Sequence, residues 1–219
     1  MDSSTDEILP KSPRRKTDTI LLSIIVVIIL GILVFVGLSI RAVILKPKAP
    51  RTQSERDYYQ YLAQVKKNPK NLEARLHLAT AYYERDEPDK AIEELKTIIR
   101  QKPKWAPAHY NLAMIYLRQE NVDAGIKELK EIIKVQPQHD LAYFQLGRIY
   151  FDEKDYKKSI EAFKKSLEIT PEAADIHYEL GLAYEKNGQD DLAKKEYKST
   201  LVYIPDHKEA KEALKRLEK

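Results

Sequence analysis

The sequence predicts an all-α fold, in which a helical-hairpin solenoid follows a single transmembrane helix. Apolar residues after residue 55 recur at i, i+3 and i+4, which is typical of amphipathic helices. An uncharged apolar run near the N-terminus is long enough for a membrane-spanning helix. Prolines recur at a step of 34 residues, at Pro69, Pro103, Pro137, Pro171 and Pro205. A repeat of this length indicates stacked structural units.

The first element is a basic tail, residues 1–19, followed by an apolar segment. Residues 20–40 carry no charge, and as a helix they would span about 32 Å, against about 30 Å of bilayer hydrocarbon. A signal peptide has a shorter apolar region of about 7–15 residues and a small-residue cleavage site. The alternative, a core helix buried on all sides, lacks an equally apolar partner in the sequence. We therefore expect a transmembrane helix at 20–41, in contact with the lipid bilayer through residues 20–40.

The charge distribution argues against nucleic-acid binding and favours one orientation. Residues 1–51 contain 8 basic and 4 acidic side chains, whereas the rest of the chain contains 30 of each. The net charge of +4 therefore flanks the apolar run, and we expect no nucleic-acid partner. Long domains cross membranes largely regardless of charge, whereas short basic tails stay inside. A single-pass protein with a cytoplasmic N-terminus and extracytoplasmic repeats is therefore favoured.

The remaining elements follow from the prolines and the repeat. Pro47 and Pro50 rule out a continuous helix between the apolar run and the repeats. The predicted segments are a linker at 42–54, a partial repeat helix at 55–71, four 34-residue hairpins at 72–205 and a C-terminal capping helix at 206–219. A charged capping helix would close the end of the stack and keep it soluble.

Large and small residues recur at fixed positions of each hairpin. Counted from the first residue of a unit, position 7 is Leu, position 11 is Tyr, positions 8 and 20 are Ala, Gly or Ser, and position 24 is large. The small residues would let the two helices approach closely, and neighbouring hairpins would then share a core. His109 has a counterpart at the same position in His177, which predicts a packing role for both.

This pattern resembles the tetratricopeptide repeat family over about residues 55–219. With Leu72, Ala106, Asp140 and Ala174 as first positions, positions 7, 8, 11, 20, 24 and 32 agree with the family in all four units. Two positions depart from it: position 4 is never Trp, and position 27 is small only in the later two units. These departures put local packing in doubt, but not the fold.

The resemblance implies a concave groove, where the first helices of successive units hold an extended peptide or a partner helix. Carried over, the partner-binding residues are Leu76, His77, Thr80, Tyr83, Tyr110, Asn111, Met114, Leu117, Phe144, Gln145, Arg148, Phe151, Tyr178, Glu179 and Leu182. Position 5 is apolar or aromatic and position 6 is polar, which suits recognition and hydrogen bonding to a peptide backbone. Alternatively, the aromatic residues at position 5 only fill space between units.

No motif predicts catalysis, a metal site or a cofactor. The five His lack the HExxH spacing, there is no Cys, and neither a Gly-rich phosphate loop nor a GxSxG motif occurs. Of the Lys and Asn set with which some family members grip a chaperone's terminal carboxylate, only Asn111 is present. We expect a non-enzymatic, membrane-anchored adaptor or scaffold that binds a protein or peptide, in assembly of a membrane or envelope complex. The alternative is a structural solenoid that self-associates into a homo-oligomer.

Overall fold

The structure is a computed structural model, and it describes residues 23–36 and 52–218. The chain divides into two units, Met1–Pro50 and Arg51–Lys219. In the first unit, residues 23–36 are helical and their side chains are exposed. The predicted tail at 1–19 and the outer parts of the predicted span, residues 20–22 and 37–41, lie outside the described residues.

The structure contradicts the predicted membrane localisation. Among the described residues, none of the helices is both long enough and apolar enough to cross a bilayer. The single-pass topology, the bilayer contact through residues 20–40 and the cytoplasmic N-terminus are therefore not supported.

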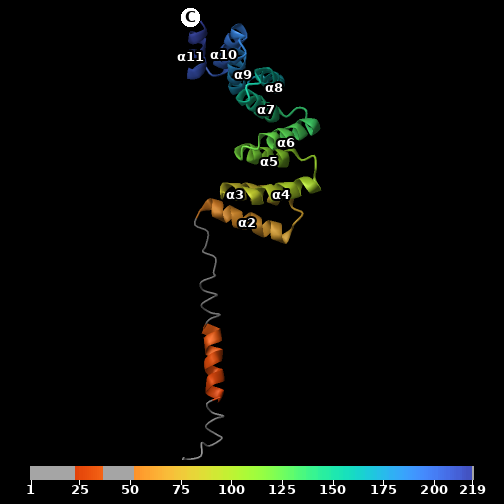
Figure 1. The fold of residues 1–219 in the computed structure, drawn as a ribbon, viewed down its shortest axis with the longest axis vertical. Coiled ribbons are helices and arrows are strands. Elements are labelled where there is room, and N and C mark those ends of the chain that lie inside the picture. Colours follow the sequence, from red (N-terminus) through yellow and green to blue (C-terminus); the bar gives the residue numbers. More distant parts are fainter. Residues whose placement is uncertain (1–22, 37–51, 219) are drawn as a thin grey trace, which may run out of the picture. The chain divides into compact units, whose positions relative to one another are not determined.

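The second unit is a stack of α-helical hairpins, as Figure 1 shows. Its helices are α2 (Gln53–Lys67), α3 (Leu72–Glu84), α4 (Pro88–Gln101), α5 (Ala106–Arg118), α6 (Val122–Val135), α7 (Asp140–Asp152), α8 (Tyr156–Ile169), α9 (Ala174–Lys186), α10 (Asp190–Tyr203) and α11 (Lys208–Leu217). The hairpins are α3/α4, α5/α6, α7/α8 and α9/α10, and each packs on the next along the chain. The prediction of an all-α helical solenoid is confirmed.

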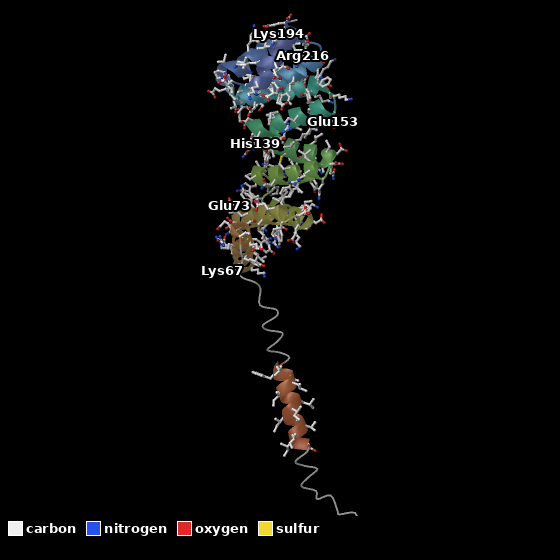
Figure 2. All side chains as sticks on the ribbon, turned by 90° about the vertical axis from the view of Figure 1, so that its left-hand side faces the viewer. Lys67, Glu73, His139, Glu153, Lys194 and Arg216 are labelled. Carbon is white, nitrogen blue, oxygen red and sulfur yellow. The ribbon has the colours of Figure 1, made fainter. Side chains whose placement is uncertain are left out.

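Side-chain caps and left-handed turns set the ends of these helices. The Asn71 and Asp155 side chains accept hydrogen bonds from the backbone N–H groups of Ala74 and Lys158, which would otherwise lack partners at a helix start. The turns within the hairpins contain a residue with positive φ: Asp86 (59°), Glu120 (59°), Lys154 (64°) and Gly188 (76°). Figure 2 shows that α7 crosses the stack, with His139 at one edge and Glu153 at the other.

The small residues at position 8 fit the large residues at position 24 in complementary pairs. Units one and two place Ala at position 8 against buried Leu, whereas units three and four place Gly against an aromatic ring. A Cβ atom added at Gly147 would lie 2.6 Å from the Phe163 ring, and one at Gly181 would lie 2.6 Å from the Tyr197 ring. The larger ring therefore fits only because glycine has no Cβ atom.

The residue at position 4 joins each unit to the connector before it. Nε2 of His109 lies 2.9 Å from the Pro103 carbonyl oxygen, and Nδ1 lies 2.6 Å from a Glu128 carboxylate oxygen. His177 makes the same two contacts with Pro171 and Glu196. Arg75 does so with Pro69 and Glu94 in the first unit. The third unit has Tyr143 and Ala162 at these positions and lacks this bridge.

The bridge at His109 predicts a pH-dependent stability. Both ring nitrogens face acceptors, and only the imidazolium form donates to both. The hydrogen bond to Glu128 raises the pKa of His109 above its ordinary value of 6.5, against the opposing effect of burial. Because the folded state has the higher pKa, the stabilisation is full below about pH 6.5 and is lost as pH rises through the folded pKa.

The test is urea unfolding of the full chain at a series of pH values, with His109→Arg as the matched variant. Arginine, as at Arg75, would donate to both acceptors at every pH. As the pH rises above 6.5, we expect the free energy of unfolding of the wild type to fall by about 1 kcal/mol, since neutral imidazole keeps one of its two hydrogen bonds. The free energy of unfolding of the variant should fall by less. Equal pH dependence in the two proteins would contradict the assignment.

The C-terminal helix is fastened to the last hairpin by the half-buried carboxylate of Glu185. The Tyr197 hydroxyl donates to Glu185 across 2.8 Å, and the Arg216 guanidinium donates to both oxygens of the same carboxylate at 2.8 Å. Burial alone would raise the pKa of Glu185, but these hydrogen bonds hold it below its ordinary value. Ala210 and Ala213 of α11 are buried in the same core. The end of the stack is thus covered by α11.

Candidate functional site

The predicted partner-binding residues lie on the first helices of the hairpins, α3, α5, α7 and α9. Within the described part of the chain, none of them is fully buried. His77, Thr80 and Arg148 are exposed, and the other members of the set are half-buried. A guest chain could therefore reach every one of these positions without the stack opening.

Positions 6, 9 and 12 line two successive hollows between first helices. Between α3 and α5, a hollow of about 100 Å³ is bordered by Thr80, Tyr83, Asn111 and Met114. Between α5 and α7, a hollow of about 470 Å³ is bordered by Met114, Leu117, Gln145 and Arg148. Met114 borders both, so the two hollows follow one another along the array. We call this surface the first-helix groove.

The larger hollow also has walls that the sequence did not predict. Val122 comes from the start of α6, and Asp152 and Glu153 come from the end of α7. They add an apolar side chain and two carboxylates to the hollow that Arg148 also lines. The signal in the sequence was weak, because these residues belong to the turn edge of the hairpins, where the units share no common residue type.

Position 5 serves packing between units more than the groove. The Tyr110 ring lies 6.0 Å from the His139 ring, and the Tyr178 ring lies 4.8 Å from the His207 ring, centroid to centroid. Each of these His side chains caps the first helix of the next unit or α11. Phe144 lies 5.9 Å from the Phe163 ring of its own hairpin. The aromatic stripe therefore holds neighbouring helices together, which favours the packing interpretation at this position.

Electrostatics differ between the two ends of the groove. At its first hollow, Arg118 donates to the Tyr83 hydroxyl across 3.0 Å, which anchors that ring at the rim. Towards α9, burial raises the pKa of Glu179, while the charge of Arg148 opposes the rise and Asp152 and Asp175 add to it. The groove can thus offer amide, thioether, phenol and guanidinium groups, which suit noncovalent contact. No group of side chains suited to a metal ion is found in residues 23–36 and 52–218.

Comparison with known proteins follows the repeat. Family models of the tetratricopeptide repeat match residues 59–109 and 106–139, and a TPR repeat model matches residues 147–188. The solved crystal structure of MamA protein is 31% identical, with a TM-score of 0.59 over 67% of this chain and 80% of that one. The chain belongs to the tetratricopeptide repeat family.

Other solved structures of MamA are also similar to this chain. A second crystal structure of MamA is 28% identical, with a TM-score of 0.63, and covers 74% of this chain and 99% of its own. MamA from Desulfovibrio magneticus RS-1, from residue 41 to its end, is 17% identical with a TM-score of 0.63, over 72% of this chain and 89% of its own. This last likeness shows the fold alone. No curated protein matches the chain.

Proposed function

We propose that this tetratricopeptide protein is a non-catalytic adaptor or scaffold that binds a peptide or helix of a partner protein in the first-helix groove. The main support is that positions 6, 9 and 12 are accessible and line two consecutive hollows. A row of hollows along the stack suits an elongated guest better than a compact small molecule. The similarity to MamA structures supports a shared repeat architecture for this role.

The groove residues also limit the chemistry of the guest. Asn111 and Gln145 carry amides that can pair with a peptide backbone, which has both donors and acceptors. Met114 lies between the hollows, and its flexible thioether adapts to apolar side chains of different shape. Arg148 is exposed and can pair with a carboxylate. Asp152 and Glu153 border the same hollow, so its charge does not select an acidic guest. The favoured guest is therefore a segment with an apolar anchor and a free backbone that the two amides can pair with.

The proposal predicts site-specific crosslinking in cells. A photoreactive amino acid in place of Met114 should yield adducts with a partner protein, whereas the same residue in place of Lys130 should not. Lys130 is exposed on α6, a second helix, and borders neither hollow. The readout is the mass and identity of the adducts after irradiation of intact cells that express the full chain.

Competing outcomes are distinct. Equal adducts from both positions, or adducts from Lys130 alone, would place the partner away from the groove. Adducts that contain only a second copy of this chain would favour the self-associating solenoid. A further variant, Asn111→Ala with Gln145→Ala, should lower the adduct yield while helicity is kept. This pair is preferable to Tyr110→Ala with Phe144→Ala, since those two rings also pack against neighbouring helices.

A further inference from the structure

The fourth hairpin has apolar residues at two positions near its end where the first three have polar ones. Position 29 is Arg100, Lys134 and Glu168 in the first three units, and position 31 is Lys102, Gln136 and Thr170. The fourth unit has Val202 and Ile204 there, with Tyr203 between them. Val202 is 74% exposed, Tyr203 45% and Ile204 41%. At positions 29 and 31 the other units keep the same fold with polar residues, so packing does not require Val202 or Ile204 to be apolar. Tyr203 differs, because its ring stacks on His177 at 5.7 Å between centroids and its position is also apolar in Val135 and Ile169.

Two of these residues, Tyr203 and Ile204, border a surface hollow at the edge of the last two units, and Val202 is their neighbour in the chain. Tyr203 and Ile204 line it from the end of α10, and Leu141 lines it from the first turn of α7. Its volume is about 550 Å³. Leu141 is itself 49% exposed, at a position where the other units have Glu73, Pro107 and Asp175. We call this the C-terminal edge hollow. Contiguous exposed apolar side chains of this kind mark interaction surfaces.

The hollow has an anionic rim. Asp140, Glu172 and Asp175 line it, and among the described residues no Lys, Arg or His does so. Asp140 accepts a hydrogen bond from the Thr170 hydroxyl across 2.8 Å, whereas Glu172 and Asp175 are exposed to solvent. Carboxylates on the rim of an apolar surface attract cations and repel acidic partners. The charge therefore selects the kind of chain that can cover the apolar floor.

We propose that the C-terminal edge hollow binds a segment of a partner protein in which apolar side chains are flanked by Lys or Arg. Apolar anchors would cover Leu141, Tyr203 and Ile204, and the flanking cations would pair with Glu172 and Asp175. A second copy of the chain fits less well, because a two-fold contact would place the same three carboxylates opposite each other. This surface is separate from the first-helix groove, because the edge hollow shares no lining residue with the two hollows of the groove.

The test uses the full chain and two labelled synthetic peptides. Both carry the same Leu and Phe residues at the same spacing, and they differ in flanking Lys against flanking Glu. Fluorescence anisotropy should show that the Lys peptide binds, at least about tenfold more tightly than the Glu peptide. Added salt should lower the affinity for the Lys peptide, since the rim carboxylates are exposed and their charges are screened. Equal affinity for the two peptides would overturn the proposal.

Matched variants assign the binding to this hollow. Val202→Glu with Ile204→Thr places the third unit's own residues at positions 29 and 31. This double variant should lower the affinity for the Lys peptide at least about tenfold, although the added carboxylate alone would favour a cationic guest. Leu192→Gln is the control, because Leu192 is 41% exposed but does not line the hollow. The affinity of the Leu192→Gln variant for the Lys peptide should equal that of the wild type, and circular dichroism should show wild-type helicity for both variants.

The rim and the groove are tested separately. Glu172→Gln with Asp175→Asn should lower the affinity and flatten its salt dependence, because the two exposed charges are removed. Met114→Ala changes only the first-helix groove and should leave the Lys peptide unaffected. Loss of binding in Met114→Ala, with binding kept in the Val202 and Ile204 variant, would overturn the proposal. The proposal would also be overturned if sedimentation showed that the full chain forms oligomers and that the Val202 and Ile204 variant is monomeric.

Discussion

Tyr197→Ala should lower the free energy of unfolding by about 3–5 kcal/mol, the range for removing a buried aromatic side chain. Tyr197 is fully buried between α9 and α10, in the core that also holds Phe163, Leu180 and Ala213. The substitution would leave a cavity in the core that also holds Ala210 and Ala213 of α11, and it would break the hydrogen bond to Glu185. Urea titration followed by circular dichroism measures the loss.

Tyr197→Phe separates the ring from the hydroxyl group. The phenyl ring keeps the core filled, and Glu185 keeps its two hydrogen bonds from Arg216. The variant should therefore lose only about 1 kcal/mol, which is typical of one hydrogen bond. If Tyr197→Phe cost as much as Tyr197→Ala, the polar group rather than ring burial would hold this end of the stack.

Gly147→Ala should also destabilise the protein, even though alanine is the better helix former by about 1 kcal/mol. The added Cβ would lie 2.6 Å from the Phe163 ring, which is fully buried and cannot move aside. Overpacking of this kind costs about 1–3 kcal/mol. Net destabilisation would thus show that the steric clash exceeds the helical preference. The measurement is again urea unfolding.

Two further variants decide whether the pairing is the cause. Phe163→Leu added to Gly147→Ala recreates the Ala and Leu pair of units one and two, so the double variant should be more stable than the sum of the single effects predicts. Gly125→Ala is the matched control. Its Cβ would lie 2.6 Å from Cδ2 and 2.7 Å from Cγ of the half-buried Leu117 side chain, which is freer to shift than the fully buried Phe163 ring, so Gly125→Ala should cost less. Additive effects at 147 and 163 would contradict the complementary packing.

The solenoid was predictable because its signal is redundant. Each of the four hairpins repeats the same proline stop, the same small position and the same large position, and stacking needs all of them. The details of each pair were not predictable. The exchange of Ala and Leu for Gly and an aromatic residue is visible in the sequence, but its meaning depends on the distance of a Cβ atom from a ring.

The groove was only partly predictable, since the family pattern places positions but does not say how each side chain is used. Positions 6, 9 and 12 lie along the two hollows, whereas Tyr110 and Tyr178 at position 5 turn towards the His caps of the following helices. The edge hollow was missed altogether. It combines Leu141 with Tyr203 and Ile204, which lie far apart in sequence and meet only in the stack.

The membrane prediction failed because it relied on apolar length alone. Hydropathy was read along the sequence, whereas among the described residues no helix is both long enough and apolar enough to cross a bilayer. The repeat prediction had an independent check in every unit. The apolar run had none, since it occurs once in the chain.

The turns within the hairpins give the array an uneven mechanical character. Asp86, Glu120 and Lys154 take up a left-handed backbone that costs a residue with a side chain about 1–2 kcal/mol, whereas Gly188 adopts it freely. Three of the four turns within the hairpins thus contain a residue in an unfavourable backbone conformation, and the fourth does not. Tension along the chain would therefore yield first among the earlier hairpins and leave the C-terminal end intact.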